Sequence, residues 1–195
     1  MLDSSAETKR AAVLSAAIRT FLDYGFKRTT MDDIAKAAGM SRPALYLVYK
    51  NKKDIYRACV TDMLETLKER LEEIIASEAA PQESVYAILE AGIINPFRLL
   101  AQTAHGQEIF DMKSELAADL FEAWMGALEA TTAATLKRAA ENGKIALDDA
   151  RMKPEDIAAV IVDGAEGIKL RMGEDGDIEG RIHALLDLIL RPLLR

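Results

Sequence analysis

The chain has 195 residues, half of them hydrophobic, which is enough to bury a substantial core in one or two domains. Five prolines and eleven glycines are too few for long disordered stretches. The single cysteine excludes an internal disulfide, while the polar N-terminus and short apolar runs predict neither an export signal nor a membrane span. We therefore expect a cytoplasmic protein that makes no membrane contact.

The net charge of −7 is unevenly distributed along the chain. Residues 1–55 hold ten Lys or Arg and six Asp or Glu, a net charge of +4, whereas residues 56–195 carry a net charge of −11. A basic N-terminal part on an acidic body fits a chain that contacts phosphate with one end only. Because the excess is modest, chance unevenness is the alternative explanation.

The N-terminal part predicts a long helix followed by a short one. The first helix, over about residues 5–24, has an apolar stripe at i, i+3, i+4 and i+7, made of Leu14, Ala17, Ile18 and Phe21. Gly25 is its expected C-terminal stop. Thr30 and Asp33 have the spacing of a capping box that opens the second helix, and Gly39 ends that helix in a tight turn.

A third short helix is expected after Ser41, which can cap it, with Pro43 tolerated in its first turn. Leu45 and Tyr49 are four residues apart, so both can face a core. Asn51 is the expected cap of a long fourth helix. Helix, glycine turn, short helix and capped long helix together predict a helix-turn-helix unit.

Five further helices are expected in the remainder, over about residues 82–94, 95–106, 114–142, 154–173 and 178–190. Asn95 and Pro96 have the pattern of a cap followed by a first-turn proline, and Gly106 interrupts or ends that helix. Neither a strand pattern nor a repeat is evident. The sequence thus predicts an all-α fold of about nine helices, with a three-helix helix-turn-helix domain (residues 1–52) joined to a C-terminal helical bundle (residues 53–195).

In such a unit the third helix enters the major groove of DNA with its N-terminal residues near the base edges. Arg42 can bond two acceptors of guanine, while Pro43 or Ala44 can lie against a thymine methyl group. The other candidates suit backbone phosphates through helix N-terminal amides or side-chain donors, and they are Thr30, Ser41, Tyr46, Lys50 and Lys52.

The stretch FKRTTMDDIAKAAGMSRPALYLVYKNKKDIY, residues 26–56, closely resembles the N-terminal signature of TetR/AcrR-type regulators, T-x-x-x-I-A-x-x-A-G-x-S-x-x-x-L-Y-x-x-[FY]-x-x-K. The pattern is matched at Thr30, Ile34, Ala35, Ala38, Gly39, Ser41, Leu45, Tyr46, Tyr49 and Lys52. Many members carry an aromatic residue or histidine directly after the tyrosine. This chain has Leu47 and Val48 there, which cannot donate side-chain hydrogen bonds. The resemblance is strong over about residues 10–60 and implies a DNA-binding transcription regulator.

The resemblance also implies a homodimer in which the last two helices pair with their twins. The candidate interface residues are Gly164, Gly167, Ile168, Ile182, Leu185, Leu186 and Ile189. One monomer needs a single inward stripe, so the surplus apolar surface suggests a partner, although it could also pack inside the monomer. Two-fold symmetry would place two recognition helices roughly 34–36 Å apart on a pseudo-palindromic operator of double-stranded DNA.

A ligand cavity in the C-terminal domain is a further implication of the resemblance. The candidate lining residues are Phe97, Gln102, Phe121, Trp124 and Met125, although ordinary core or surface roles are the alternative for each. A small-molecule effector would then release a repressor from its operator by favouring a conformer that does not fit DNA. The alternative is a DNA-binding regulator without such an effector, controlled by a protein partner.

Catalysis, a metal site and a cofactor are not expected. The chain has two histidines and no Ser-His-Asp, Walker or glycine-rich signature, and Cys59 has no partner cysteine. Cys59 is either a small buried apolar residue or a redox sensor.

Overall fold

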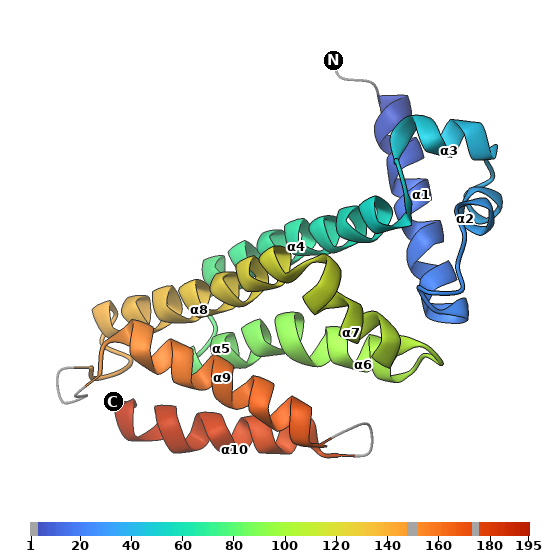
Figure 1. Cartoon of the computed structure of the whole chain (residues 1–195). Coiled ribbons are helices and arrows are strands. Elements are labelled where there is room, and N and C mark those ends of the chain that lie inside the picture. Colours follow the sequence, from blue (N-terminus) through green and yellow to red (C-terminus); the bar gives the residue numbers. More distant parts are fainter. Residues whose placement is uncertain (1–3, 148–151, 173–175) are drawn as a thin grey trace. The chain divides into compact units, whose positions relative to one another are not determined.

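In the computed structural model, the described residues 4–147, 152–172 and 176–195 form ten α-helices and no strand (Figure 1). The prediction of an all-α protein is therefore confirmed. The chain packs as two compact units, Met1–Glu65 with Leu99–Phe121 and Thr66–Arg98 with Glu122–Arg195. Packing defines these units, so the assignment of separate functions to residues 1–52 and 53–195 stays a prediction.

The first unit contains the head, a three-helix bundle of α1 (Ser4–Tyr24), α2 (Met31–Ala37) and α3 (Arg42–Val48) (Figure 1). The first part of α4 (Lys52–Ala76) and all of α7 (Gly106–Leu116) complete the unit. Leu14, Phe21, Ile34 and Leu45 lie in its core and are no more than 2% exposed, while Ile18 of the predicted stripe is partly buried. A buried core of this kind fixes the three head helices relative to one another.

The helix starts in the head follow the predicted caps. The Thr30 hydroxyl oxygen accepts from the Asp33 amide at 3.2 Å, and the Asp33 carboxylate accepts from the Thr30 amide at 2.9 Å, so the capping box is confirmed. The Ser41 hydroxyl oxygen accepts from the Ala44 amide at 3.3 Å at the start of α3. The Asn51 side chain likewise accepts from the first amides of α4.

Between the helices predicted over about residues 95–106 and 114–142, the structure has a separate helix, α7. Gly106 begins α7, and α8 (Ala118–Glu141) begins four residues later than expected. Arg57 of α4 explains the break, because its guanidinium donates to the Leu116 carbonyl at 2.8 Å and to both carboxylate oxygens of Asp119 at 2.7 Å. One side chain thus satisfies the end of α7 and the first turn of α8.

The second unit is formed by the remaining helices: α5 (Pro81–Leu89), α9 (Pro154–Met172), α10 (Ile178–Leu190), and most of α8 with the end of α4. In it α9 and α10 lie side by side (Figure 1). Between α5 and α6 (Asn95–Ala101) the chain forms a π-helical turn, η1 (Glu90–Ile94).

The helix α6 begins at Asn95 as predicted, but Asn95 does not cap it, because α5, η1 and α6 form one uninterrupted helical run. The Asn95 amide donates to the Glu90 carbonyl in the wide π pattern instead of serving as a cap. Pro96 has no amide hydrogen to donate to Gly92 four residues earlier. The Trp124 indole takes that carbonyl instead, with its Nε1 donating to the Gly92 oxygen at 2.9 Å.

The same run corrects the expectation that no apolar segment reaches the length of a membrane span. Pro81–Ala101 is long and apolar enough to cross a membrane by length and composition. A core helix of a water-soluble bundle has the same properties. Val85, Ile88, Leu89 and Ile93 are at most 1% exposed inside the second unit, which is the behaviour of a core helix.

Candidate nucleic-acid interface

The turn between α2 and α3 gives the head its helix-turn-helix geometry. Gly39 has a φ of +67°, in the left-handed region that favours glycine, and nothing lies within 4 Å of the position that a Cβ would occupy. The Met40 amide donates to the Ala35 carbonyl at 2.9 Å and the Gly39 amide to the Lys36 carbonyl at 3.1 Å. These bonds close the end of α2 and direct the chain into α3.

The recognition face, defined here as the exposed side of α3 and its cap, contains most of the predicted base-contacting residues. Ser41, Arg42 and Pro43 are exposed and Ala44 is half-buried, while Leu45 on the opposite side is fully buried. The face therefore stands on a rigid core and is open to solvent. That arrangement permits contact with base edges.

Arg42 and Tyr46 act as a pair on this face. The Arg42 guanidinium lies 5.6 Å from the centroid of the Tyr46 ring, within the range of a cation–π contact. The ring restrains a side chain that could bond two guanine acceptors, and Arg42 as a whole is exposed. Lys50, just beyond the end of α3, is also exposed and is suited to phosphate.

The structure places Lys52 in a different role from the phosphate contact predicted for it. Its Nζ donates to the carbonyls of Phe26, Lys27 and Thr29 at 2.7, 3.0 and 2.9 Å. An ammonium group has three hydrogens to donate, and all three are used here. Burial lowers the pKa of Lys52, opposed by the nearby carboxylate of Glu108. Lys52 is thus a clamp on the segment that joins α1 to α2.

A second side chain holds the same segment from α7. The Glu108 carboxylate accepts from the Lys27 amide at 2.8 Å. A Cβ on Gly25 would lie 2.5 Å from a Glu108 oxygen, and Gly25 has a φ of +82°, so this contact requires glycine. Lys52 takes the carbonyls and Glu108 takes an amide, so the backbone of residues 25–29, the clamped loop, is fixed from two sides.

Thr30 has less to offer a phosphate than the sequence suggested. Its hydroxyl donates to the Asp33 carboxylate at 2.6 Å and accepts from the Asp33 amide. These hydrogen bonds lower the pKa of Asp33, so a carboxylate lies beside the hydroxyl at neutral pH. A phosphate at this helix start would therefore be bound by the first backbone amides of α2 and not by the Thr30 hydroxyl.

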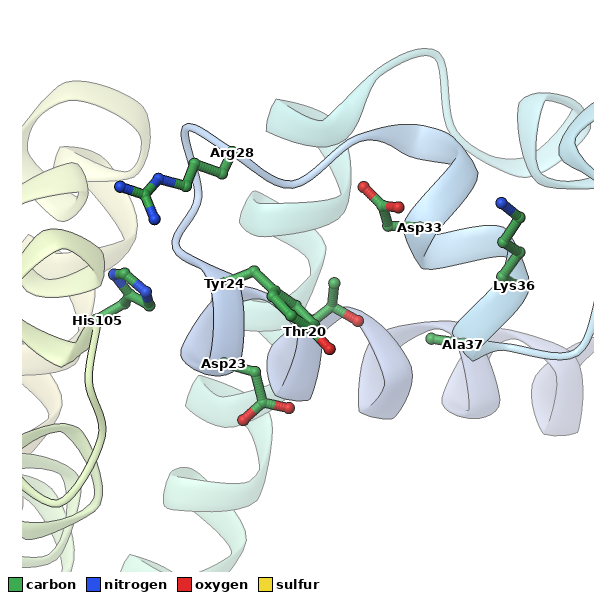
Figure 2. Close-up of a pocket in the computed structure, with 8 residues that line it drawn as sticks. All are labelled: Thr20, Asp23, Tyr24, Arg28, Asp33, Lys36, Ala37 and His105. Atoms are coloured by element: carbon green, nitrogen blue, oxygen red, sulfur yellow. The ribbon is translucent and has the colours of Figure 1, made fainter.

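A cleft of about 430 Å³ lies on the first unit and is lined by residues of α1, of α2 and of the segment between them (Figure 2). Figure 2 shows Arg28 and His105 at one end and Asp33 and Lys36 of α2 at the other. The remaining lining residues are Thr20, Asp23, Tyr24 and Ala37. Asp33 serves the capping box and Lys36 pairs with Asp32 at 2.8 Å. Sequence reasoning missed this cleft because residues 20–37 and His105 share no local pattern.

The predicted ligand-lining residues are distributed over both units. Phe97, Trp124 and Met125 belong to the second unit, and Gln102 and Phe121 to the first. Gln102 follows the end of α6 and is exposed, so it does not continue a helical face from Arg98. Trp124 is buried, with its indole used by Gly92. The cleft of Figure 2 contains none of these residues.

The predicted dimer residues divide into buried and accessible groups. Ile182 and Leu186 are 0% exposed, so packing inside the chain covers them, and their assignment to an interface is corrected. Gly164 lies against Leu185, with a hypothetical Cβ 2.8 Å from a Leu185 methyl carbon, which is again a contact within the chain. Gly167, Ile168, Leu185 and Ile189 are half-buried.

Three exposed apolar side chains lie on the same two helices. Val160 and Leu170 on α9 are 47% and 67% exposed, and Leu188 on α10 is 77% exposed. Gly167 is one or two turns from the two α9 residues, and no atom lies within 4 Å of its hypothetical Cβ. These four residues define the α9–α10 face, which has room for close approach by another helix.

Cys59, on α4, is a core residue of the first unit. It is 3% exposed, and its thiol lies 3.7 Å from the Leu14 carbonyl. Burial raises the pKa of the Cys59 thiol to about 12, and Asp62 adds to the shift. A thiol that stays protonated and covered does not have the properties of a redox sensor.

The first part of the chain is similar to known proteins. The family profile described as "Bacterial regulatory proteins, tetR family" matches residues 13–59, which cover most of the head. The transcriptional regulator TtgR of Pseudomonas putida is 31% identical over 121 residues, 60% of this chain and 56% of that protein. The chain spans about half the length of the curated relatives that it matches.

Solved structures extend the likeness to the whole fold. A TetR transcription regulator from Haloarcula marismortui has a TM-score of 0.74 at 17% identity, covering 97% of this chain and all of that one. A complex of SmeT with triclosan has a TM-score of 0.70 at 19% identity, covering 96% and 92%. SmeT is described as the repressor of a Stenotrophomonas maltophilia multidrug efflux pump. At these identities the likeness concerns the fold alone.

Proposed function

We propose that this chain is a dimeric transcription regulator that binds specific double-stranded DNA, because residues 13–59 match the profile of the tetR family of bacterial regulatory proteins. The observation that carries the proposal is the recognition face, where Ser41, Arg42 and Pro43 are exposed on a helix whose inner side is fully buried. Residues 1–52 would bind DNA, and residues 53–195 would bind an effector and dimerise. The expected compartment is the cytoplasm, where such a regulator meets its operator.

The bonding capacity of the face supports sequence-specific contact. Arg42 has the fork geometry for guanine, and the tyrosine ring beneath it limits the conformations it samples. Lys50 and Tyr46 would hold phosphates and set the register, together with the amides that follow Ser41. Lys52 is left out of this set, because its hydrogens bond to backbone carbonyls within the head.

The α9–α10 face supports a two-fold dimer. Val160, Leu170 and Leu188 leave apolar area in solvent, and the open space at Gly167 admits a partner helix. A dimer of this kind would read two half-sites roughly 34–36 Å apart.

A small-molecule effector is the control that we propose. The structurally similar SmeT binds triclosan, which supports a ligand site in this fold. The effector would favour a conformer that fits the operator poorly, and α4, which contributes residues to both compact units, would carry the change. Control by a protein partner is the alternative, and a panel of metabolites tested for shifts in the melting temperature separates the two.

The test is selection of bound duplexes from a random pool, using the full chain at a fixed salt concentration. We expect enrichment of a pseudo-palindrome whose half-sites are about one DNA turn apart. A pool without enrichment would contradict the proposal, as would binding that is equally strong for every duplex.

Arg42→Ala provides a sharper test of the recognition face. Loss of one bidentate contact is expected to relax the preference at one base position in each half-site, by about 1–3 kcal/mol. Lys50→Ala is the matched control, because removal of a phosphate contact should weaken all duplexes alike and reduce the salt slope. If both variants lose affinity equally for every duplex, the base-reading role of Arg42 is wrong.

A further inference from the structure

The side chain of Leu47 is the most exposed of the large apolar side chains that the structure describes, at 89%. Leu47 lies roughly 160° around α3 from Leu45, at 100° per residue. Since Leu45 is fully buried, Leu47 points away from the core of the head. It therefore lies at the centre of the recognition face, where exposure of an apolar side chain to water is unfavourable.

The neighbours of Leu47 divide the recognition face into two strips. Pro43 is exposed and lies one helical turn before Leu47, so the two form a short apolar strip. Arg42 and Tyr46 form a polar strip beside it. No acidic residue occurs from Ser41 to Lys53, whereas three exposed basic residues do, namely Arg42, Lys50 and Lys53. An apolar strip with a basic border is complementary to a polyanion that exposes apolar groups at defined positions.

The major groove of B-DNA exposes one such group, the 5-methyl of thymine. We propose that Leu47, with Pro43 beside it, contacts thymine methyl groups and so sets a preference for thymine at one or two positions of each half-site. The inference rests on the proposed function and adds the chemical group that is read. It also gives a role to the residue at which the chain departs from the usual pattern of its family.

The experiment uses the best duplex from the random pool, with each thymine replaced singly by deoxyuracil, which removes only the methyl group. For the unmodified protein we expect about a fourfold loss of affinity at one or two positions per half-site. In Leu47→Ala the same replacements should have no effect at those positions. Leu47→Ala should melt at the same temperature as the unmodified protein, because the side chain makes no core contact.

Leu99→Ala is the matched control, since Leu99 is an exposed leucine on α6, outside the recognition face. It should keep the full loss at deoxyuracil. Unmodified protein that is insensitive to every replacement would overturn the inference while the proposed function stands. The same holds if Leu47→Ala keeps the loss, because another side chain then reads the methyl. A pool that yields no preferred duplex contradicts the proposed function and, with it, this inference.

Discussion

The ammonium group of Lys52 bonds to main-chain oxygens 23 to 26 residues earlier in the chain. It also lies 4.7 Å from the centroid of the Phe26 ring. A lysine that contacts a DNA phosphate contributes to DNA binding. A lysine whose hydrogens bond to backbone carbonyls of its own chain contributes to the stability of the fold. The two roles predict different consequences of substitution.

Lys52→Met keeps the length and apolar stem of the side chain and removes the charge. We expect a loss of about 1.5–3 kcal/mol in the free energy of unfolding of the head, because hydrogen bonds from a charged donor are lost and partly buried carbonyls remain. Urea unfolding followed by circular dichroism measures it. Lys53→Met is the control, since Lys53 is exposed and makes one long surface ion pair, with its Nζ 3.9 Å from a carboxylate oxygen of Glu115. It should change the free energy of unfolding by less than about 0.5 kcal/mol. If the variant keeps its stability but DNA binding depends less steeply on salt concentration, Lys52 contacts a phosphate and is not a clamp.

Cys59 gives a prediction about both reactivity and pH. Because burial raises the pKa of the thiol to about 12, the native protein should resist alkylation by iodoacetamide at pH 8, whereas the urea-unfolded chain should react fully. The folded pKa lies above the unfolded one, so the contribution to stability is present below about pH 9 and is lost as the pH rises towards 12. Mass spectrometry after a timed reaction measures the modification. Rapid native modification would mean that the head opens or that Cys59 is accessible.

At the scale of elements, the sequence was most informative where the determinants are local. The caps at Thr30, Ser41 and Asn51 are patterns within four consecutive residues, and each forms as predicted. The glycine turn at Gly39 is likewise a property of one residue. Such elements are predictable because the residues that decide them are neighbours in the chain.

Long-range contacts to the backbone could not be predicted from residue types. Lys52 bonds to carbonyls, which every residue has, so its partners left no mark in the sequence. Arg57 of α4 likewise donates to a carbonyl, that of Leu116 at the end of α7. The cap predicted at Asn95 failed for the same reason, because an indole from α8 takes over the carbonyl that Pro96 leaves free. Tertiary contacts override local start signals in each case.

Trp124→Phe tests the last of these contacts. The variant leaves the Gly92 carbonyl without a donor in a buried place, so we expect a loss of about 1–3 kcal/mol in the free energy of unfolding. Met125→Leu is the control, as a volume-conserving change in the next residue, and should cost less than about 1.5 kcal/mol. Circular dichroism is the appropriate probe, because the chain has a single tryptophan. Equal effects of the two variants would mean that the indole hydrogen bond contributes little.

At the scale of the whole molecule, the prediction concerns assembly. A charge on the α9–α10 face should separate the protomers, because an ionised group would be buried against apolar side chains. We expect Leu188→Glu to be monomeric by analytical ultracentrifugation and to bind the operator at least tenfold more weakly.

Leu99→Glu provides the control for that experiment, since Leu99 is exposed on α6 and lies outside the α9–α10 face. It should remain dimeric and bind normally. A Leu188→Glu variant that stays dimeric would place the interface elsewhere, whereas a monomer with full affinity would contradict recognition by paired heads.

The clamped loop has a consequence for how this protein can diversify. Its anchoring bonds to Lys52 and Glu108 run through main-chain atoms, so they constrain the path of the loop and not the identity of the side chains at Lys27 and Arg28. Mutations at these two positions can accumulate without loss of the anchor. A library randomised at Lys27 and Arg28 is therefore a low-risk starting point for engineering variants with an altered surface just before α2.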